Sequence, residues 1–196
     1  LGQLSMLDGY HRFMLRPSYI EIAHLPLAER LVAMREPARR AAILAETDSA
    51  EAKTRNPVLA DYVGVLAAIT PELFPLTLPL DYEPGEEKRL SSLARAAGKT
   101  DEEYLYDHFT AGDGRNITAA FQLNYEQGNL DIVREMMANP TIISGLGDAG
   151  AHMKLICDSS LASFQLAFWT RDRTRGPKLP LEAVVRKMTH DCATLY

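Results

Sequence analysis

The carboxyl-terminal part of the chain switches repeatedly between two hydrophobic patterns, and this alternation restricts the fold more than any other feature. The runs ITAAFQL (117–123) and TIISGL (141–146) are short and apolar, which is typical of buried strands. After each of them comes a segment with apolar residues at helical spacing, NLDIVREMM and SSLASFQLAFWTR. This order is typical of a parallel sheet covered by helices. We therefore expect an α/β fold.

The chain before these runs is richer in helix signals. LAERLVAMR and PARRAAILAE each have an amphipathic pattern, and LGQLSML at the start is typical of a short strand. Between Thr47 and Glu87, five prolines predict that the apolar runs form only short elements. Gly98 should end one helix, and Thr100 with Glu103 should cap the next. We expect residues 47–110 to be a helical and irregular insertion in the α/β framework.

Composition and charge restrict the partners of the chain. With 46% hydrophobic and 24% charged residues, it has the composition of a soluble globular protein. Acidic residues outnumber basic ones by 26 to 21, and no block of Lys and Arg offers the basic surface that nucleic-acid binding requires. No apolar stretch approaches the ~20 residues that span a bilayer. We expect a cytoplasmic protein that binds neither nucleic acid nor membranes, with Cys157 and Cys192 as reduced thiols.

The segment SGLGDAGAH (144–152) places a single carboxylate among three glycines. In a parallel α/β protein, residues just beyond the carboxyl end of a strand face the active site, and TIISGL delivers Asp148 to that position. Gly145, Gly147 and Gly150 remove side chains around it, which allows a close backbone approach or a positive φ. A carboxylate in this position can bind a metal ion or take a proton from a water molecule. The alternative is a Gly-Asp turn in which Asp148 only caps the following segment.

Three further residues extend this candidate site. His152, four residues after Asp148, can hydrogen-bond a substrate, or it is a buried structural histidine. Asn124 and Tyr125 follow the preceding predicted strand and can bind the same ligand. The alternative for this segment is a turn in which Asn129 caps a helix.

The segment RDRTRG contains three arginines after a predicted helix: Arg171, Arg173 and Arg175. Such groups can bind a substrate carboxylate. Cations near the end of a helix also stabilise its dipole, and we favour this second interpretation.

The remaining histidines do not complete a metal site. They form no His-x-His and no His-Glu-x-x-His pattern, being scattered along the chain at His11, His24, His108 and His190. One carboxylate and one nearby histidine are fewer than the three protein ligands of a catalytic zinc site. We expect this chain alone to hold zinc weakly or not at all.

The stretches FQLNYEQGNLDIVREMM, NPTIISGLGDAGAHMKLICDSS and WTRDRTRG with LPLEAVVRKMTHDCATLY resemble the amidohydrolase superfamily. Within it, they are most similar to the N-acyl-D-amino-acid deacylase branch, also termed D-aminoacylase-like proteins. The opening LGQLSML and the stretch FMLRPSYIEIAHLPLAERLVAMREP extend the resemblance over nearly the whole chain. These stretches are specific for the branch rather than for one substrate.

The resemblance implies a metal-dependent hydrolase on a distorted (β/α)8 barrel, with zinc as cofactor and a small-molecule amide as substrate. Asp148 matches the aspartate that follows the last barrel strand, touches the metal and handles the water proton. The histidine ligands and the bridging ligand of the family have no counterpart in this sequence. The resemblance therefore implies that residues 1–196 are the carboxyl-terminal part of a barrel, a partial (β/α)8 barrel that is inactive in isolation.

Two functions remain as hypotheses. The first is a portion of a metal-dependent hydrolase that cleaves the amide bond of N-acyl-D-amino acids or related amides. In it, Asp148 is the catalytic residue and metal ligand, and His152, Asn124 and Tyr125 bind the substrate. The second is a non-catalytic, helix-rich binding or assembly module that keeps the barrel segment as a scaffold. The sequence makes no prediction about the oligomeric state.

Overall fold

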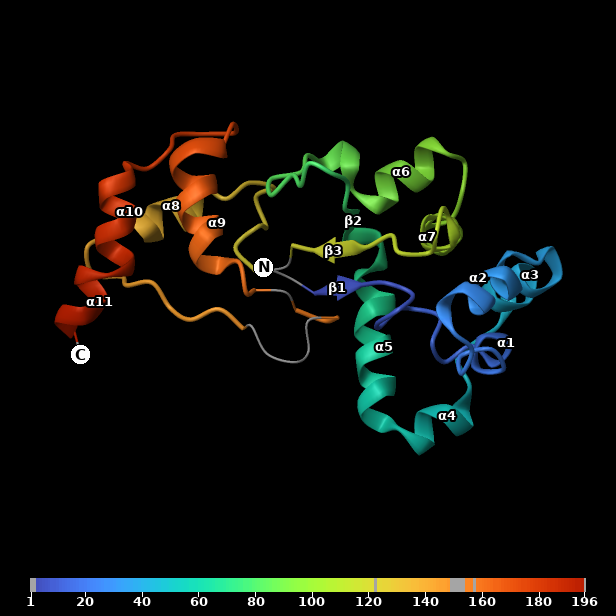
Figure 1. The fold of residues 1–196 in the computed structure, drawn as a ribbon. Coiled ribbons are helices and arrows are strands. Elements are labelled where there is room, and N and C mark those ends of the chain that lie inside the picture. The colour runs from blue at the N-terminus through green and yellow to red at the C-terminus, as the bar shows by residue number, and fades with distance from the viewer. Residues whose placement is uncertain (1–2, 122, 149–153, 157, 196) are drawn as a thin grey trace. The chain divides into compact units, whose positions relative to one another are not determined.

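The computed structural model describes residues 3–121, 123–148, 154–156 and 158–195 (Figure 1). The chain divides into two compact units, Gly2–Phe121 and Gln122–Tyr196, termed here the amino-terminal and the carboxyl-terminal unit. Helices predominate over strands in the described part of the chain.

The amino-terminal unit combines helices with a small antiparallel sheet. In the sheet, β1 (Leu4–Ser5) and β2 (Leu73–Pro75) lie on either side of β3 (Thr118–Ala120). Ala119 in β3 pairs with residues of both neighbouring strands. The helices are α1 (Pro17–Ile20), α2 (Leu27–Arg35), α3 (Pro37–Ala45), α4 (Ala50–Arg55), α5 (Pro57–Ile69), α6 (Leu90–Ala96) and α7 (Asp101–Thr110), with the 3-10 helices η1 (Thr70–Glu72) and η2 (Glu86–Lys88).

The carboxyl-terminal unit consists of helices and irregular segments in its described part. It begins with α8 (Asp131–Ala138) and ends with α11 (His190–Leu195). Between them, α9 (Leu161–Ala167) continues directly into the π-helical turn η3 (Phe168–Asp172). Helix α9 packs against α10 (Leu181–Met188), and the two lie side by side in Figure 1.

The predicted fold class, an α/β fold with a partial (β/α)8 barrel, is wrong. The structure is 53% helix and 4% strand, and its three-stranded sheet is antiparallel rather than parallel. The predicted strands at the start of the chain and at 117–123 are present only as short pieces, β1 and β3. Residues 142–148, which include most of the expected strand TIISGL, are irregular.

Side chains contact carbonyl oxygens that a strand at TIISGL would use for hydrogen bonds to a neighbouring strand. The ammonium group of Lys187 on α10 donates hydrogen bonds to the carbonyl oxygens of Asn139 and Ile142. The thiol of Cys192 on α11 lies 3.7 Å from the carbonyl oxygen of Ser144. Within TIISGL, these contacts give the carbonyl groups of Ile142 and Ser144 partners without a neighbouring strand. The apolar run therefore packs on helices instead of joining a sheet.

The proline-rich connection contains a longer helix than its prolines predict. Helix α5 covers Pro57–Ile69 and includes the whole run YVGVLAAI. Pro57 is in the first turn, where the missing N–H has no helical partner in any case. The side chain of Asn56 caps this end by accepting a hydrogen bond from the N–H of Leu59 at 3.0 Å. Since Pro71 lies beyond the last residue of α5, the prolines bracket the helix instead of interrupting it.

Helix signals that act over a few residues are confirmed. Helices α2, α3 and α8 match the predicted segments. At the start of α7, the Thr100 hydroxyl accepts from the Glu103 N–H at 3.2 Å, and the Glu103 carboxylate accepts from the Thr100 N–H at 2.8 Å. Gly98, after α6, has a φ of 66°, a conformation that a glycine adopts without a Cβ clash. Each signal depends only on neighbouring residues, which makes it readable from the sequence.

A hydrophobic core connects α1, α2, α3, α6 and α7 in the amino-terminal unit. Six of its side chains have no exposed surface: Phe13, Met34, Ile43, Leu90, Leu105 and Phe109. The buried Tyr106 ring also lies in this core, and its hydroxyl donates to the carbonyl oxygen of Met34 at 2.8 Å. The one polar atom of this ring is therefore satisfied away from water.

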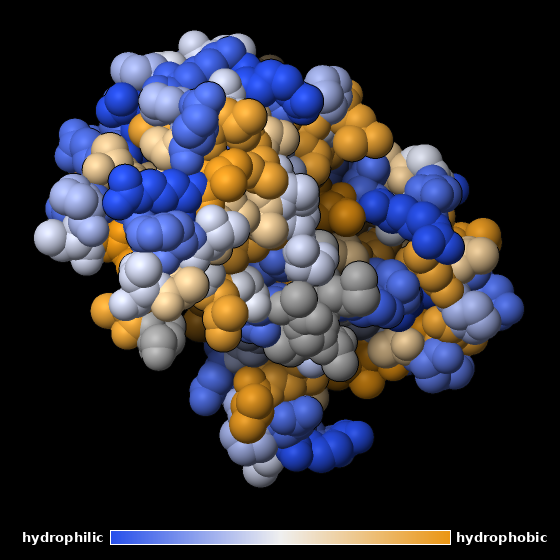
Figure 2. Space-filling view, turned by 60° about the vertical axis from the view of Figure 1, so that its left-hand side comes forward, coloured by the Kyte–Doolittle hydropathy of each residue, from blue (hydrophilic) through white to orange (hydrophobic). Residues whose placement is uncertain are grey.

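Apolar side chains also appear on the surface. Figure 2 shows them in orange between blue polar residues on the face that it draws. Within the ranges that the structure describes, no helix combines the length and the apolar character needed to cross a membrane.

Candidate functional site

Asp148 is exposed and belongs to an irregular segment, residues 142–148, rather than lying beyond a strand. The preceding residues Leu146 and Gly147 are exposed as well. Water and small solutes therefore have access to these residues. A carboxylate in such a position remains accessible to a ligand, but the sheet edge that was expected to orient it is absent from the described residues.

Gly147 fixes the backbone immediately before Asp148. A Cβ atom at this position would lie 2.7 Å from the backbone oxygen of Asp158 and 3.1 Å from the Cβ of Leu161, at the start of α9. A backbone oxygen cannot move aside as a flexible side chain can, so this close approach requires glycine. Of the two roles predicted for these glycines, a close backbone approach or a positive φ, the structure shows the first at Gly147. Gly145 faces open space instead, and Gly150 lies outside the described residues.

His152 and Cys157 lie outside the described residues, so the structure does not relate them to Asp148. Within the described ranges, no three side chains of His, Cys, Asp or Glu converge in a group that could hold a metal ion. A catalytic zinc site requires about three protein ligands. The described residues therefore do not form a complete site for the metal that the family resemblance implies.

Asn124 and Tyr125 have different surroundings. Asn124 is exposed and has a φ of 62°, a left-handed conformation that asparagine tolerates better than most residues. Tyr125 is buried, and its hydroxyl accepts a hydrogen bond from Arg175 at 3.4 Å. The side chain of Asn129 accepts a hydrogen bond from the N–H of Asp131, the first residue of α8, at 2.9 Å. These contacts support the turn interpretation of this segment.

Arg173 has a structural environment that neither interpretation of its segment anticipated. Its side chain is 0% exposed, and one guanidinium nitrogen donates to the carboxylate of Asp131 at 2.6 Å. The guanidinium carbon lies 5.1 Å from the ring centroid of Trp169, within the range of a cation–π contact. A Cβ atom at Gly176 would come within 2.9 Å of the guanidinium group. Arg173 therefore connects α8 to η3 inside the unit instead of facing a substrate.

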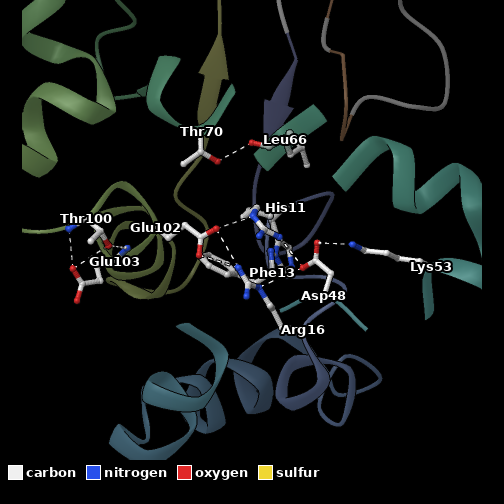
Figure 3. Close-up of polar contacts among 11 residues, drawn as sticks. His11, Phe13, Arg16, Asp48, Lys53, Leu66, Thr70, Thr100, Glu102 and Glu103 are labelled. Carbon is white, nitrogen blue, oxygen red and sulfur yellow. Dashed lines mark hydrogen bonds and ion pairs between the residues drawn. The ribbon is translucent and has the colours of Figure 1, made fainter. Parts of the chain in front are cut away.

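A charged network in the amino-terminal unit was not expected from the sequence (Figure 3). Arg12 contacts Asp48 and Glu102, each at 2.8 Å. Arg16 contacts the same two carboxylates at 3.4 Å and 3.0 Å. The ammonium group of Lys53 lies 3.7 Å from the second oxygen of Asp48. We term these residues the Arg12–Arg16 network.

The Arg12–Arg16 network joins parts of the chain that are far apart in sequence. Arg16 immediately precedes α1, Asp48 precedes α4, and Glu102 is in the first turn of α7. The side chains of Arg16 and Asp48 are only 6% and 11% exposed. Each carboxylate is shared by two guanidinium groups, so the network holds segments together instead of presenting a carboxylate to a ligand. In the sequence, the only local indication of this network is the four-residue spacing between Arg12 and Arg16.

His11 is a second ionisable group inside this unit. It is fully buried, and its Nε2 lies 2.8 Å from the hydroxyl oxygen of Tyr19. Burial, together with the positive charge of Arg30, lowers the pKa of His11 to about 3. The folded protein therefore contains the neutral imidazole across the physiological range of pH.

We expect the buried state of His11 to make the amino-terminal unit less stable as the pH falls from 6.5 towards 3. In this window the unfolded chain binds a proton at His11, with the ordinary pKa of 6.5, whereas the folded chain does not bind it until about pH 3. The stability lost between pH 7 and pH 4.5 is roughly 2–3 kcal/mol. Urea unfolding of wild type and His11→Gln at pH 7, 5.5 and 4.5 measures this effect.

The substitution His11→Gln should flatten the pH dependence of the unfolding free energy, whatever it does to stability at pH 7. His190→Gln is the matched control, because the side chain of His190 is 65% exposed. A His11→Gln protein that keeps the wild-type slope would contradict the prediction.

No protein-family model matches this chain, and comparisons with curated proteins and with solved structures found no match. The membership in the deacylase branch that the sequence stretches predict therefore stays a prediction.

Proposed function

We propose that the chain is part of a metal-dependent hydrolase that cleaves the amide bond of N-acyl-D-amino acids or related amides. The observation that carries this proposal is the exposed carboxylate of Asp148, in a motif that resembles this branch of hydrolases. Gly147 supports it by holding the backbone before Asp148 against the start of α9. The proposal concerns the chemistry of this carboxylate and does not require a barrel.

In this function, Asp148 acts as a general base. An ionised carboxylate accepts the proton of the attacking water, so that the developing hydroxide adds to the amide carbon. The departing amine then needs a proton, which the same carboxyl group can return. Zinc is the proposed cofactor, with Asp148 as one ligand, and its other ligands would be residues beyond those described.

The test is an assay of amine release by a longer protein that contains residues 1–196, supplied with zinc. The substrates are an N-acyl-D-amino acid and its L enantiomer. Release from the D enantiomer supports the proposal. No release from either enantiomer by a protein with bound zinc would refute it.

The second candidate is a non-catalytic, helix-rich binding or assembly module. It is favoured by the helix-rich architecture and by large apolar side chains on the surface, such as Val58, Leu78 and Leu123, which are 79%, 88% and 72% exposed. Exposed apolar surface often marks a site of interaction. This candidate predicts no amide hydrolysis, so the same assay separates the two functions.

A further inference from the structure

An apolar pocket lies in the carboxyl-terminal unit, beside the segment that leads to Asp148. It is half open, with a volume of about 480 Å³. Its walls come from residues 143–146, from α9 and from the helices α10 and α11. The apolar lining includes Ile143, Leu146, Leu161 and Met188. Leu146 is fully exposed to solvent, so its apolar side chain is accessible to a ligand.

The polar groups of the lining are largely bonded to one another. The hydroxyl of Ser144 donates to the side-chain oxygen of Gln165 at 3.1 Å. The thiol of Cys192 lies 3.3 Å from the carbonyl oxygen of Lys187 and 3.7 Å from that of Ser144. Among the described residues of the lining, none has a charged side chain. This chemistry favours an uncharged hydrocarbon group over a phosphate or a carboxylate, whose burial without a partner is costly.

The buried side chain of Gln165 adds one polar contact for a ligand. Its oxygen is occupied by Ser144, which leaves its amide nitrogen as a donor at the pocket. An amide or ester carbonyl at one end of an apolar chain could accept this hydrogen bond. The pocket thus has the features of a small-molecule site, an apolar lining with few polar groups.

The pocket is close to Asp148 because both belong to one short segment. Leu146 and Asp148 are two residues apart, so their Cα atoms are at most about 7 Å from each other. Gly147, between them, is held against Asp158 and Leu161. A ligand that contacts Leu146 therefore lies near the backbone of Asp148, so that one end of it can reach the carboxylate.

We propose that this pocket binds the acyl chain of the substrate, and that it favours a medium-length linear chain over a short one. The inference rests on the proposed function for the identity of the ligand, because only the hydrolase provides a reason for an acyl amide beside Asp148. The pocket is far larger than an acetyl group needs, and each methylene group that leaves water adds affinity.

The test uses the alkylation of Cys192 by iodoacetamide in a Cys157→Ser background, with sodium octanoate and sodium butanoate as probes. Cys192 is half-buried and lines the pocket, so a bound chain should shield its thiol. We expect octanoate to protect Cys192 at a concentration about tenfold lower than butanoate does, because it buries more methylene groups. Equal protection by the two acids would overturn the proposal.

Two matched variants locate the binding site. Ala162 on α9 is exposed and lines this pocket, so Ala162→Phe should fill it and abolish protection by octanoate. Ala183 on α10 is also exposed but lines a separate pocket of about 450 Å³, so Ala183→Phe should leave the protection unchanged. Circular dichroism verifies that both variants are folded. Wild-type protection in Ala162→Phe would overturn the proposal.

The failure of this inference is distinguishable from the failure of the proposed function. Hydrolysis of an N-acyl-D-amino acid without protection of Cys192 refutes the proposed acyl-chain pocket and supports the proposed hydrolase function. Protection of Cys192 without hydrolysis by the zinc-supplied longer protein supports a site for an aliphatic chain and overturns the assignment of that chain to a substrate.

Discussion

Asp148→Asn should lower the kcat of the proposed hydrolase by about 10²–10⁴-fold, the usual contribution of a general base. The amide of asparagine has nearly the shape of the carboxylate, but it cannot accept a proton at neutral pH. The substitution therefore removes the chemistry and keeps the size of the side chain. The measurement is kcat for an N-acyl-D-amino acid, on the longer protein that contains this chain.

The fold of the Asp148→Asn protein should be unchanged. Asp148 is exposed, and the tight backbone contact before it is made by Gly147. Glu135→Gln, which removes an exposed carboxylate on α8, is the control and should keep the wild-type kcat. If Asp148 only forms a turn, asparagine replaces it with little effect. A near-normal kcat for Asp148→Asn would exclude this residue from the reaction.

Asp48→Asn should lower the free energy of unfolding of the amino-terminal unit by about 3–5 kcal/mol. Asp48 is the shared partner of Arg12, Arg16 and Lys53, and its side chain is 11% exposed. Without its charge, Glu102 alone faces two guanidinium groups that are largely removed from water. An uncompensated charge that is largely buried destabilises the folded state by more than a surface ion pair stabilises it.

Urea denaturation followed by far-UV circular dichroism measures this loss. Glu51→Gln is the matched control, since it also removes one negative charge next to an arginine. Its ion pair with Arg55 is exposed on both sides, at 85% and 71%. We expect a change of at most about 0.5 kcal/mol for Glu51→Gln. Similar midpoints for the two variants would show that the Arg12–Arg16 network does not stabilise this unit.

Most helices were predictable, and the candidate site was predictable only in part. The capping box of Thr100 and Glu103 and the left-handed Gly98 follow from residues that lie next to each other. Gly147 was correctly linked to a close backbone approach, although its partners at Asp158 and Leu161 were not. The environments of Arg173 and of Asp48 could not be anticipated, because Asp131 is 42 positions from Arg173 and the two arginines that contact Asp48 are 36 and 32 positions from it.

The apolar run TIISGL shows why a local pattern did not decide the fold. A short apolar segment satisfies the pattern of a buried strand, but a strand also needs a neighbour for its backbone hydrogen bonds. Here Lys187 and Cys192 contact the carbonyl groups of this region. The choice between sheet and irregular segment was therefore made by residues that follow it by more than forty positions.

By itself, the sequence determined where most helices begin and end, since caps, prolines and glycines act on the backbone within one turn. It also determined that a glycine precedes Asp148, whereas the strict steric role of this glycine comes from its tertiary contacts with Asp158 and Leu161. The tertiary structure alone decided that the strands pair antiparallel, that Asp48 balances two arginines and that Arg173 is buried on Trp169. These features depend on which distant segments pack together. Because the hydrophobic effect is non-directional, a local sequence pattern does not specify which segment packs against which.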